Sequence, residues 1–79
     1  MYKYKVAIVT GQDVHDFVRA ISNTSDDTKV YLSDDDCVQV SAKSLLGVIY
    51  TLEWSQVYCY SNKPISDIIL PWIVEEDNG

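Results

Sequence analysis

Ser44 is the side chain of this sequence that is best placed for chemistry, because its hydroxyl stands just before a short amphipathic segment. Four apolar residues recur at the spacing of one helical face, and they are Leu45, Val48, Ile49 and Leu52. A serine at this position is typical of a helix N-cap, where its hydroxyl accepts a hydrogen bond from a first-turn amide. The residues off this face, left for solvent or a partner, include Leu46, Gly47 and Tyr50.

Other groups of reactive side chains give weaker indications. Asp34, Asp35 and Asp36 are consecutive, and a tight turn cannot direct three adjacent carboxylates at one cation, so we expect no metal site. Cys37 and Cys59 make neither a metal quartet nor a disulfide framework, and both lie in strand-like runs, where a free cysteine packs as a small apolar side chain. The sequence has no glycine-rich phosphate loop and no catalytic triad pattern, so we expect no cofactor and no catalytic residues.

The segment Ser41–Ile49, with the sequence SAKSLLGVI, resembles the part of the bacterial HPr phosphocarrier family that holds its regulatory serine. In that family a Lys-Ser-(Ile/Leu) step begins the second helix, and bulky apolar residues follow, often with a glycine. The resemblance implies that Ser44 corresponds to the serine phosphorylated by HPr kinase. It also implies a surface, formed by Leu45, Leu46, Gly47 and Ile49, that docks on proteins such as HPr kinase or a transcriptional regulator. We expect Lys43 and Tyr50 to belong to the same partner-binding surface.

The connection between the first strand and the first helix departs from the family. Phosphocarriers have a Gly-(Leu/Ile)-His-(Ala/Thr)-Arg-Pro-Ala loop there, and its histidine takes a phosphoryl group from phosphoenolpyruvate through enzyme I. This sequence has only Thr10-Gly11-Gln12-Asp13, which is several residues shorter and contains no His, Arg or Pro. The resemblance therefore implies a degenerate member of the phosphotransferase system that lacks the carrier loop.

His15 is the only histidine of the chain. Alignment of Phe17–Ala20 on the first helix of the family places His15 inside that helix, past the carrier loop. Asp13 and Asp16 lie close to it in the sequence and would repel an incoming phosphate dianion. We therefore expect a solvent-exposed helical histidine, and the alternative is a phosphocarrier that uses a displaced His15 as phosphoacceptor.

Length and charge restrict the class of protein. The 79 residues are expected to form one domain, residues 1–79, with a frayed acidic tail at 75–79. The net charge of −6 leaves no cationic stripe of the kind that nucleic acids or anionic membranes require. No apolar run is long enough to span a bilayer, and the N-terminal residues lack the apolar region of a signal peptide, so we expect a reduced, cytoplasmic protein.

Hydrophobic patterns predict the element order β-α-β-β-α-β-α. The expected strands are Tyr2–Val9, Val30–Leu32, Val38–Val40 and Gln56–Tyr60. The expected helices are Val14–Ser22 with Asp13 as N-cap, the segment after Ser44, and a third that starts near Pro64 and kinks or ends near Leu70 because of Pro71. Three helices on one face of a four-stranded antiparallel sheet would bury every apolar stripe, so we expect an α+β open-faced sandwich. The HPr family has this order of elements.

These observations favour a protein that binds partner proteins through its second helix over an enzyme. Phosphorylation of Ser44 would add charge beside Leu45 and Leu46 and change which partner fits, and Lys43 could pair with the phosphate. An unrelated split-βαβ binding or dimerisation module, in which Ser44 is only a cap, is a second alternative. The six tyrosines would offer a surface for a homodimer or another partner if they gather on the open face of the sheet, although ordinary strand propensity also explains them.

Overall fold

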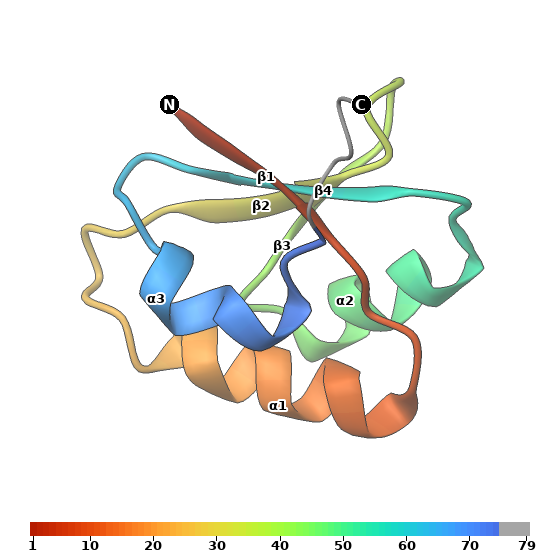
Figure 1. The fold of residues 1–79 in the computed structure, drawn as a ribbon, viewed down its shortest axis with the longest axis horizontal. Coiled ribbons are helices and arrows are strands. Elements are labelled where there is room, and N and C mark those ends of the chain that lie inside the picture. Colours follow the sequence, from red (N-terminus) through yellow and green to blue (C-terminus); the bar gives the residue numbers. More distant parts are fainter. Residues whose placement is uncertain (75–79) are drawn as a thin grey trace.

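The computed structural model describes residues 1–74, and the predicted frayed tail 75–79 lies outside the described residues. Four strands form one antiparallel sheet in the order β1-β4-β2-β3, and they are β1 (Tyr2–Val6), β2 (Val30–Ser33), β3 (Gln39–Ser41) and β4 (Val57–Ser61). One face is covered by α1 (Gly11–Ser22), α2 (Leu45–Tyr50) and α3 (Ser66–Ile69), as Figure 1 shows. The predicted α+β class, antiparallel sheet and element order are therefore confirmed.

The core lies between the sheet and the helices because alternate strand residues face the helices. These include Val30 and Leu32 of β2 and Val57 and Cys59 of β4. The helices contribute buried side chains that include Phe17, Ile21, Val48 and Ile69. Phe17 also meets the ring of Trp72 edge to face, with 5.2 Å between the ring centroids. Burial raises the pKa of the Cys59 thiol to about 12, so this cysteine packs as an apolar group.

Helix α1 begins at Gly11, three residues before the predicted Val14, because Thr10 and not Asp13 is its N-cap. The Thr10 hydroxyl accepts a hydrogen bond from the Asp13 amide at 3.0 Å. The Asp13 carboxylate accepts in return from the amides of Thr10 and Val9, each at 3.1 Å. This reciprocal capping box satisfies the amides of Val9, Thr10 and Asp13 with two side chains, which explains why Asp13 itself is not the cap.

Strand β1 ends at Val6 and not at the predicted Val9. Its partner β4 begins at Val57, directly opposite Val6, so the ladder has no further residues to pair. Beyond this point a segment from the end of the described chain lies along the outer edge of β1. The Ala7 amide donates to the Trp72 carbonyl at 2.8 Å, and the Val74 amide donates to the Lys5 carbonyl at 2.9 Å.

The predicted core face of α2 is wrong in three of its four positions. Val48 is buried, whereas Leu45, Ile49 and Leu52 are 48%, 45% and 39% exposed. A helix of six residues that packs against β3 presents little length to the core. The next residue that faces the core is Thr51, the first residue of the 3-10 helix η1 (Thr51–Glu53). The buried hydroxyl of Thr51 donates to the Val48 carbonyl at 2.6 Å.

The third helix is as short as its prolines predict. Helix α3 begins at Ser66, two residues after Pro64, and ends at Ile69. The chain continues as the 3-10 helix η2 (Leu70–Trp72), which contains Pro71, so the predicted early end near Leu70 is confirmed.

Cys37 is exposed in the turn between β2 and β3, and its predicted strand position is wrong. The turn takes up residues 34–38, and β3 begins only at Gln39. Asp34 explains the length of this turn, because its side chain accepts from the amides of Asp36 and Val38 and holds those residues outside the ladder.

Candidate functional site

Ser44 caps α2 as predicted. Its backbone is extended, with φ −97° and ψ 115°, and its hydroxyl accepts a hydrogen bond from the Gly47 amide at 3.1 Å. The side chain is exposed, and the first turn of α2 contains no acidic residue. Ser44 is therefore open to solvent, and the first turn of α2 places no carboxylate beside its hydroxyl.

Four side chains of α2 form an exposed apolar surface, which we call the α2 surface. Their exposed fractions are 48% for Leu45, 68% for Leu46, 45% for Ile49 and 60% for Tyr50. Leu45 and Ile49 are four residues apart, as are Leu46 and Tyr50, so each pair lies on neighbouring turns of the helix. Contiguous apolar and aromatic side chains of this kind are typical of surfaces that bind proteins.

Gly47 and Lys43 are placed differently from the other residues predicted for partner binding. A Cβ at Gly47 would lie 3.2 Å from the Val40 Cβ and 3.3 Å from the Ser41 carbonyl oxygen, so the glycine allows α2 to approach β3 closely. The Lys43 ammonium group donates to the Ser25 carbonyl at 3.3 Å and is thus directed toward the loop between α1 and β2. Contacts of these two residues with a partner stay a prediction.

His15 lies inside α1 with a side chain that is 57% exposed, as the sequence predicts. Its Nδ1 atom is 3.9 Å from a carboxylate oxygen of Asp16. At the N-terminus of the same helix, hydrogen bonds from the amides of Thr10 and Val9 lower the pKa of Asp13 below its ordinary value. The end of α1 nearest His15 therefore holds a fixed carboxylate that already occupies two backbone donors.

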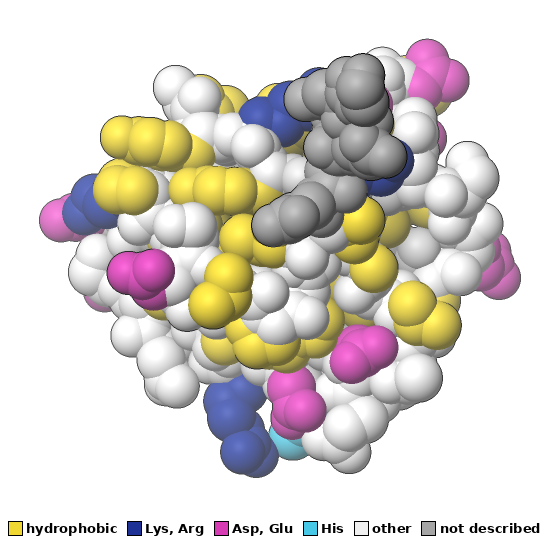
Figure 2. Space-filling view, viewed as in Figure 1, with side chains coloured by type: hydrophobic (Ala, Val, Ile, Leu, Met, Phe, Trp, Pro, Cys, Tyr) yellow, Lys and Arg dark blue, Asp and Glu magenta, His cyan; other side chains and the backbone are white. Residues whose placement is uncertain are grey.

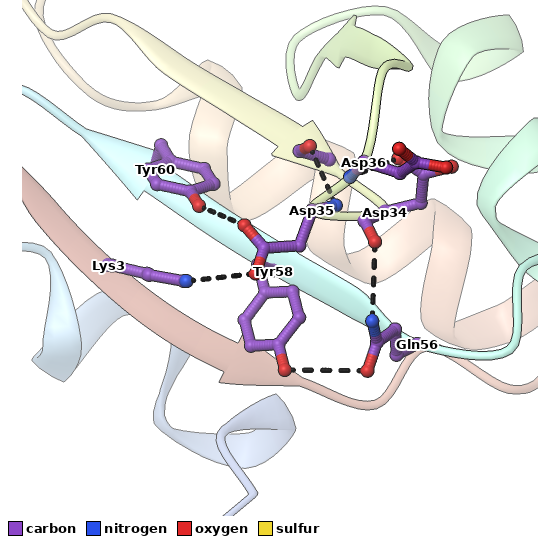
Figure 3. Close-up of polar contacts among 8 residues, drawn as sticks. Lys3, Asp34, Asp35, Asp36, Gln56, Tyr58 and Tyr60 are labelled. Carbon is purple, nitrogen blue, oxygen red and sulfur yellow. Dashed lines mark hydrogen bonds and ion pairs between the residues drawn. The ribbon is translucent and has the colours of Figure 1, made fainter.

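A second group of side chains occupies the open face of the sheet, the face opposite the helices, and is shown in Figure 3. Asp35 lies at its centre, and its carboxylate accepts from the Tyr60 hydroxyl at 2.7 Å and from the Lys3 ammonium group at 3.2 Å. The Lys3 nitrogen also lies 4.5 Å from the centroid of the Tyr58 ring. The hydrogen bonds from Tyr60 and Lys3 lower the pKa of Asp35, and those with Tyr60 and Asp35 raise the pKa of Lys3.

The turn between β2 and β3 is shaped to bring Asp35 over the sheet. Asp35 has a φ of 66°, a left-handed conformation that aspartate adopts more readily than most residues. Its amide donates to the Ser33 hydroxyl at 2.9 Å, and the Gln56 side chain donates to the Asp34 carbonyl at 3.4 Å. The sequence predicts an acidic turn here and leaves open whether tyrosines gather on this face. It does not reveal the contacts of Asp35, because Lys3 and Tyr60 are 32 and 25 residues away.

Within the described residues 1–74, no group of three or more His, Cys, Asp or Glu side chains is arranged to hold a metal ion. In the same part of the chain, no helix has the length and apolar character needed to cross a membrane. Comparison of the sequence and structure with protein-family models, with curated proteins and with solved structures finds no match. The candidate sites are therefore defined by their own geometry.

Proposed function

We propose that this protein is an HPr-like adaptor that has lost phosphocarrier chemistry and that binds partner proteins through the α2 surface. The observation that carries this proposal is the position of Ser44, an exposed hydroxyl at the start of a helix whose Leu45, Leu46, Ile49 and Tyr50 are all exposed. The four-stranded antiparallel sheet with three helices on one face supports the family resemblance of the Ser41–Ile49 segment.

Phosphorylation of Ser44 would regulate the α2 surface electrostatically. A phosphoserine carries a charge of about −1.5 to −2 at pH 7, and here it would stand next to Leu45 in an otherwise apolar surface. Its oxygens can still accept the hydrogen bond from the Gly47 amide that the hydroxyl accepts in the unmodified protein. The helix would therefore keep its cap, while partners that bury apolar groups would be replaced by partners that supply cations.

The N-terminus of α1 supports a non-carrier role. The short connection before Gly11 leaves no loop to hold a phosphorylated histidine, and the Asp13 carboxylate takes the amides of Val9 and Thr10. A phosphate brought to this end of the helix would meet a negative charge and would find these donors already engaged.

An intact-mass assay tests the phosphorylation. We expect HPr kinase with ATP to add one phosphate to the protein and to the Ser41→Ala control, and none to Ser44→Ala. In a second arm with enzyme I and phosphoenolpyruvate, we expect no added mass. A phosphate from phosphoenolpyruvate that disappears in His15→Ala would contradict the proposal and support a carrier. No phosphate from the kinase would contradict the regulatory role of Ser44.

A matched pair of leucine variants tests docking at the α2 surface. Leu46 and Leu70 are 68% and 65% exposed but lie on different helical segments, α2 and η2. We expect Leu46→Asp to lower kcat/KM for phosphorylation by HPr kinase at least about tenfold, because central apolar contacts dominate binding. Leu70→Asp is expected to leave it unchanged. Equal effects of the two variants would show that the α2 surface is not the docking site.

A further inference from the structure

We infer that the open face of the sheet binds an arginine side chain of a partner protein, in a depression beside the turn between β2 and β3. The depression has a volume of about 370 Å³, and its lining includes Tyr31, Ser33, Asp35, Asp36, Gln39 and Tyr60. Its strand residues lie on the open face of the sheet, whereas α2 covers the other face (Figure 1), so this inference does not depend on the proposed function.

The strand register gives Tyr60 a basic neighbour on one side and an uncharged neighbour on the other. Tyr60 of β4 is paired with Lys3 of β1 on one side and with Tyr31 of β2 on the other. In the next row, Tyr58 is paired with Lys5 and with Ser33. The β1 side of the open face is therefore basic, whereas the β2 side offers aromatic rings, a hydroxyl and the carboxylates of the turn.

Lys3 shows what this surface does with a cation. Its ammonium group lies against the Tyr58 and Tyr60 rings, at 4.5 and 5.5 Å from their centroids, and it pairs with Asp35. The depression on the other side of Tyr60 repeats these components, with Tyr31 as the ring and Asp36 as the carboxylate. Such a combination of tyrosine rings and a carboxylate attracts organic cations through the ring quadrupole and through charge.

Asp36 supplies the charge that the depression needs. Asp35 is already neutralised by Lys3, but among residues 1–74 the Asp36 carboxylate has no hydrogen bond or ion pair. Arginine fits this arrangement better than lysine because its planar guanidinium group stacks on a ring and binds a carboxylate with two hydrogen bonds. The net charge of −6 also favours approach of a basic partner over approach of a second copy of this chain.

A titration followed by NMR tests this inference directly. The probe is the peptide acetyl-Gly-Arg-Gly-amide, and its control is the same peptide with citrulline, which has nearly the same shape but no charge. We expect saturable shifts with the arginine peptide at the amides of Tyr31, Asp36 and Gln39. The citrulline peptide is expected to produce none.

Two variants and a matched control locate the site. Asp36→Asn and Tyr31→Leu are each expected to weaken binding about threefold or more, because one removes the carboxylate and the other the ring. Asp26→Asn makes the same change in net charge in the loop between α1 and β2, and it should bind as the unmodified protein does. A dispersed amide spectrum of each variant shows that it is folded.

Three results would overturn the inference. Equal shifts with the citrulline peptide would show that the positive charge is not recognised. The lack of any saturable shift would show that the depression does not bind arginine. Equal weakening by Asp26→Asn and Asp36→Asn would show that only the overall charge matters. None of these results bears on phosphorylation of Ser44, so the inference and the proposed function are tested independently of each other.

Discussion

Helices α1 and α2 begin with the same hydrogen bond but with opposite electrostatic consequences. Thr10 and Ser44 each accept from the amide three residues ahead, at 3.0 and 3.1 Å. The third residue of α1 is Asp13, whose carboxylate accepts hydrogen bonds from the Val9 and Thr10 amides. The third residue of α2 is Gly47, which has no side chain to accept one. With the same cap hydrogen bond, the residue at the third position therefore decides whether a carboxylate lies at the helix start, as it does in α1 but not in α2.

The largest effect is expected when the third position of α2 is made like that of α1. Gly47→Asp would supply a carboxylate for a capping box, but its Cβ would lie 3.2 Å from the Val40 Cβ. We expect a loss of about 1–3 kcal/mol in the free energy of unfolding, because overpacking outweighs the added cap. Urea unfolding measures this loss. A variant more stable than the parent would show that packing of α2 on β3 is loose.

A smaller effect is expected when each cap is removed. Thr10→Ala should cost about 1–2 kcal/mol and Ser44→Ala about 0.5–1 kcal/mol, because α1 has twelve residues with a reciprocal cap and α2 has six with a single bond. Chemical unfolding of both variants gives the comparison, with Thr10→Ser and Ser44→Thr as controls that keep the hydroxyl. The reverse order would mean that the Asp13 hydrogen bonds add nothing to the cap.

The pH dependence of stability should distinguish the two helix starts. The pKa of Asp13 lies below its ordinary value of 3.8, chiefly because the Thr10 and Val9 amides donate to its carboxylate. Its stabilisation is therefore complete above about pH 5 and is lost as the pH falls through the lowered pKa. We expect the free energy of unfolding to fall less steeply between about pH 5 and 2 in Asp13→Asn than in the unmodified protein.

Ser44→Ala is the control for this measurement, because it removes a cap that does not titrate. Its pH profile should run parallel to that of the unmodified protein. Asp35 also has a lowered pKa and adds a loss of the same sign, which both variants retain. If the free energy of unfolding of Asp13→Asn falls as steeply with pH as that of the unmodified protein, groups other than Asp13 cause the acid sensitivity.

The smallest effect is expected at His15. Its side chain is 57% exposed, so His15→Ala should change the free energy of unfolding by less than about 0.5 kcal/mol. The variant should also be phosphorylated by HPr kinase as the unmodified protein is, with intact mass as the measurement. A larger change in either quantity would contradict the interpretation of His15 as a solvent-exposed helical residue.

Local signals in the sequence predicted the features that depend on neighbouring residues. The Ser44 cap, the early end of α3 and the antiparallel α+β arrangement follow from spacings of a few residues, and the structure has all three. The start of α1 was missed because Thr10 and Asp13 are both good caps, and only the geometry of the turn decides between them.

Other features depend on residues that the sequence does not place side by side. The exposure of Leu45 and Ile49 follows from how α2 sits on β3, which a helical period alone cannot reveal. The contacts of Asp35 require β1, β4 and a turn to be assembled first, so no local pattern points to them.

The segment that lies along β1 has a consequence for synthesis of the chain. Strand β1 precedes α1 and α2 in the chain, whereas both of its neighbours, β4 and the residues that pair through Ile73 and Val74, follow them. During synthesis β1 therefore lacks its sheet partner until β4 has left the exit tunnel, after α1 and α2, and its outer edge is paired only once Val74 has followed. Contacts so distant in sequence slow folding, so this small protein is expected to fold more slowly than a helical bundle of its size.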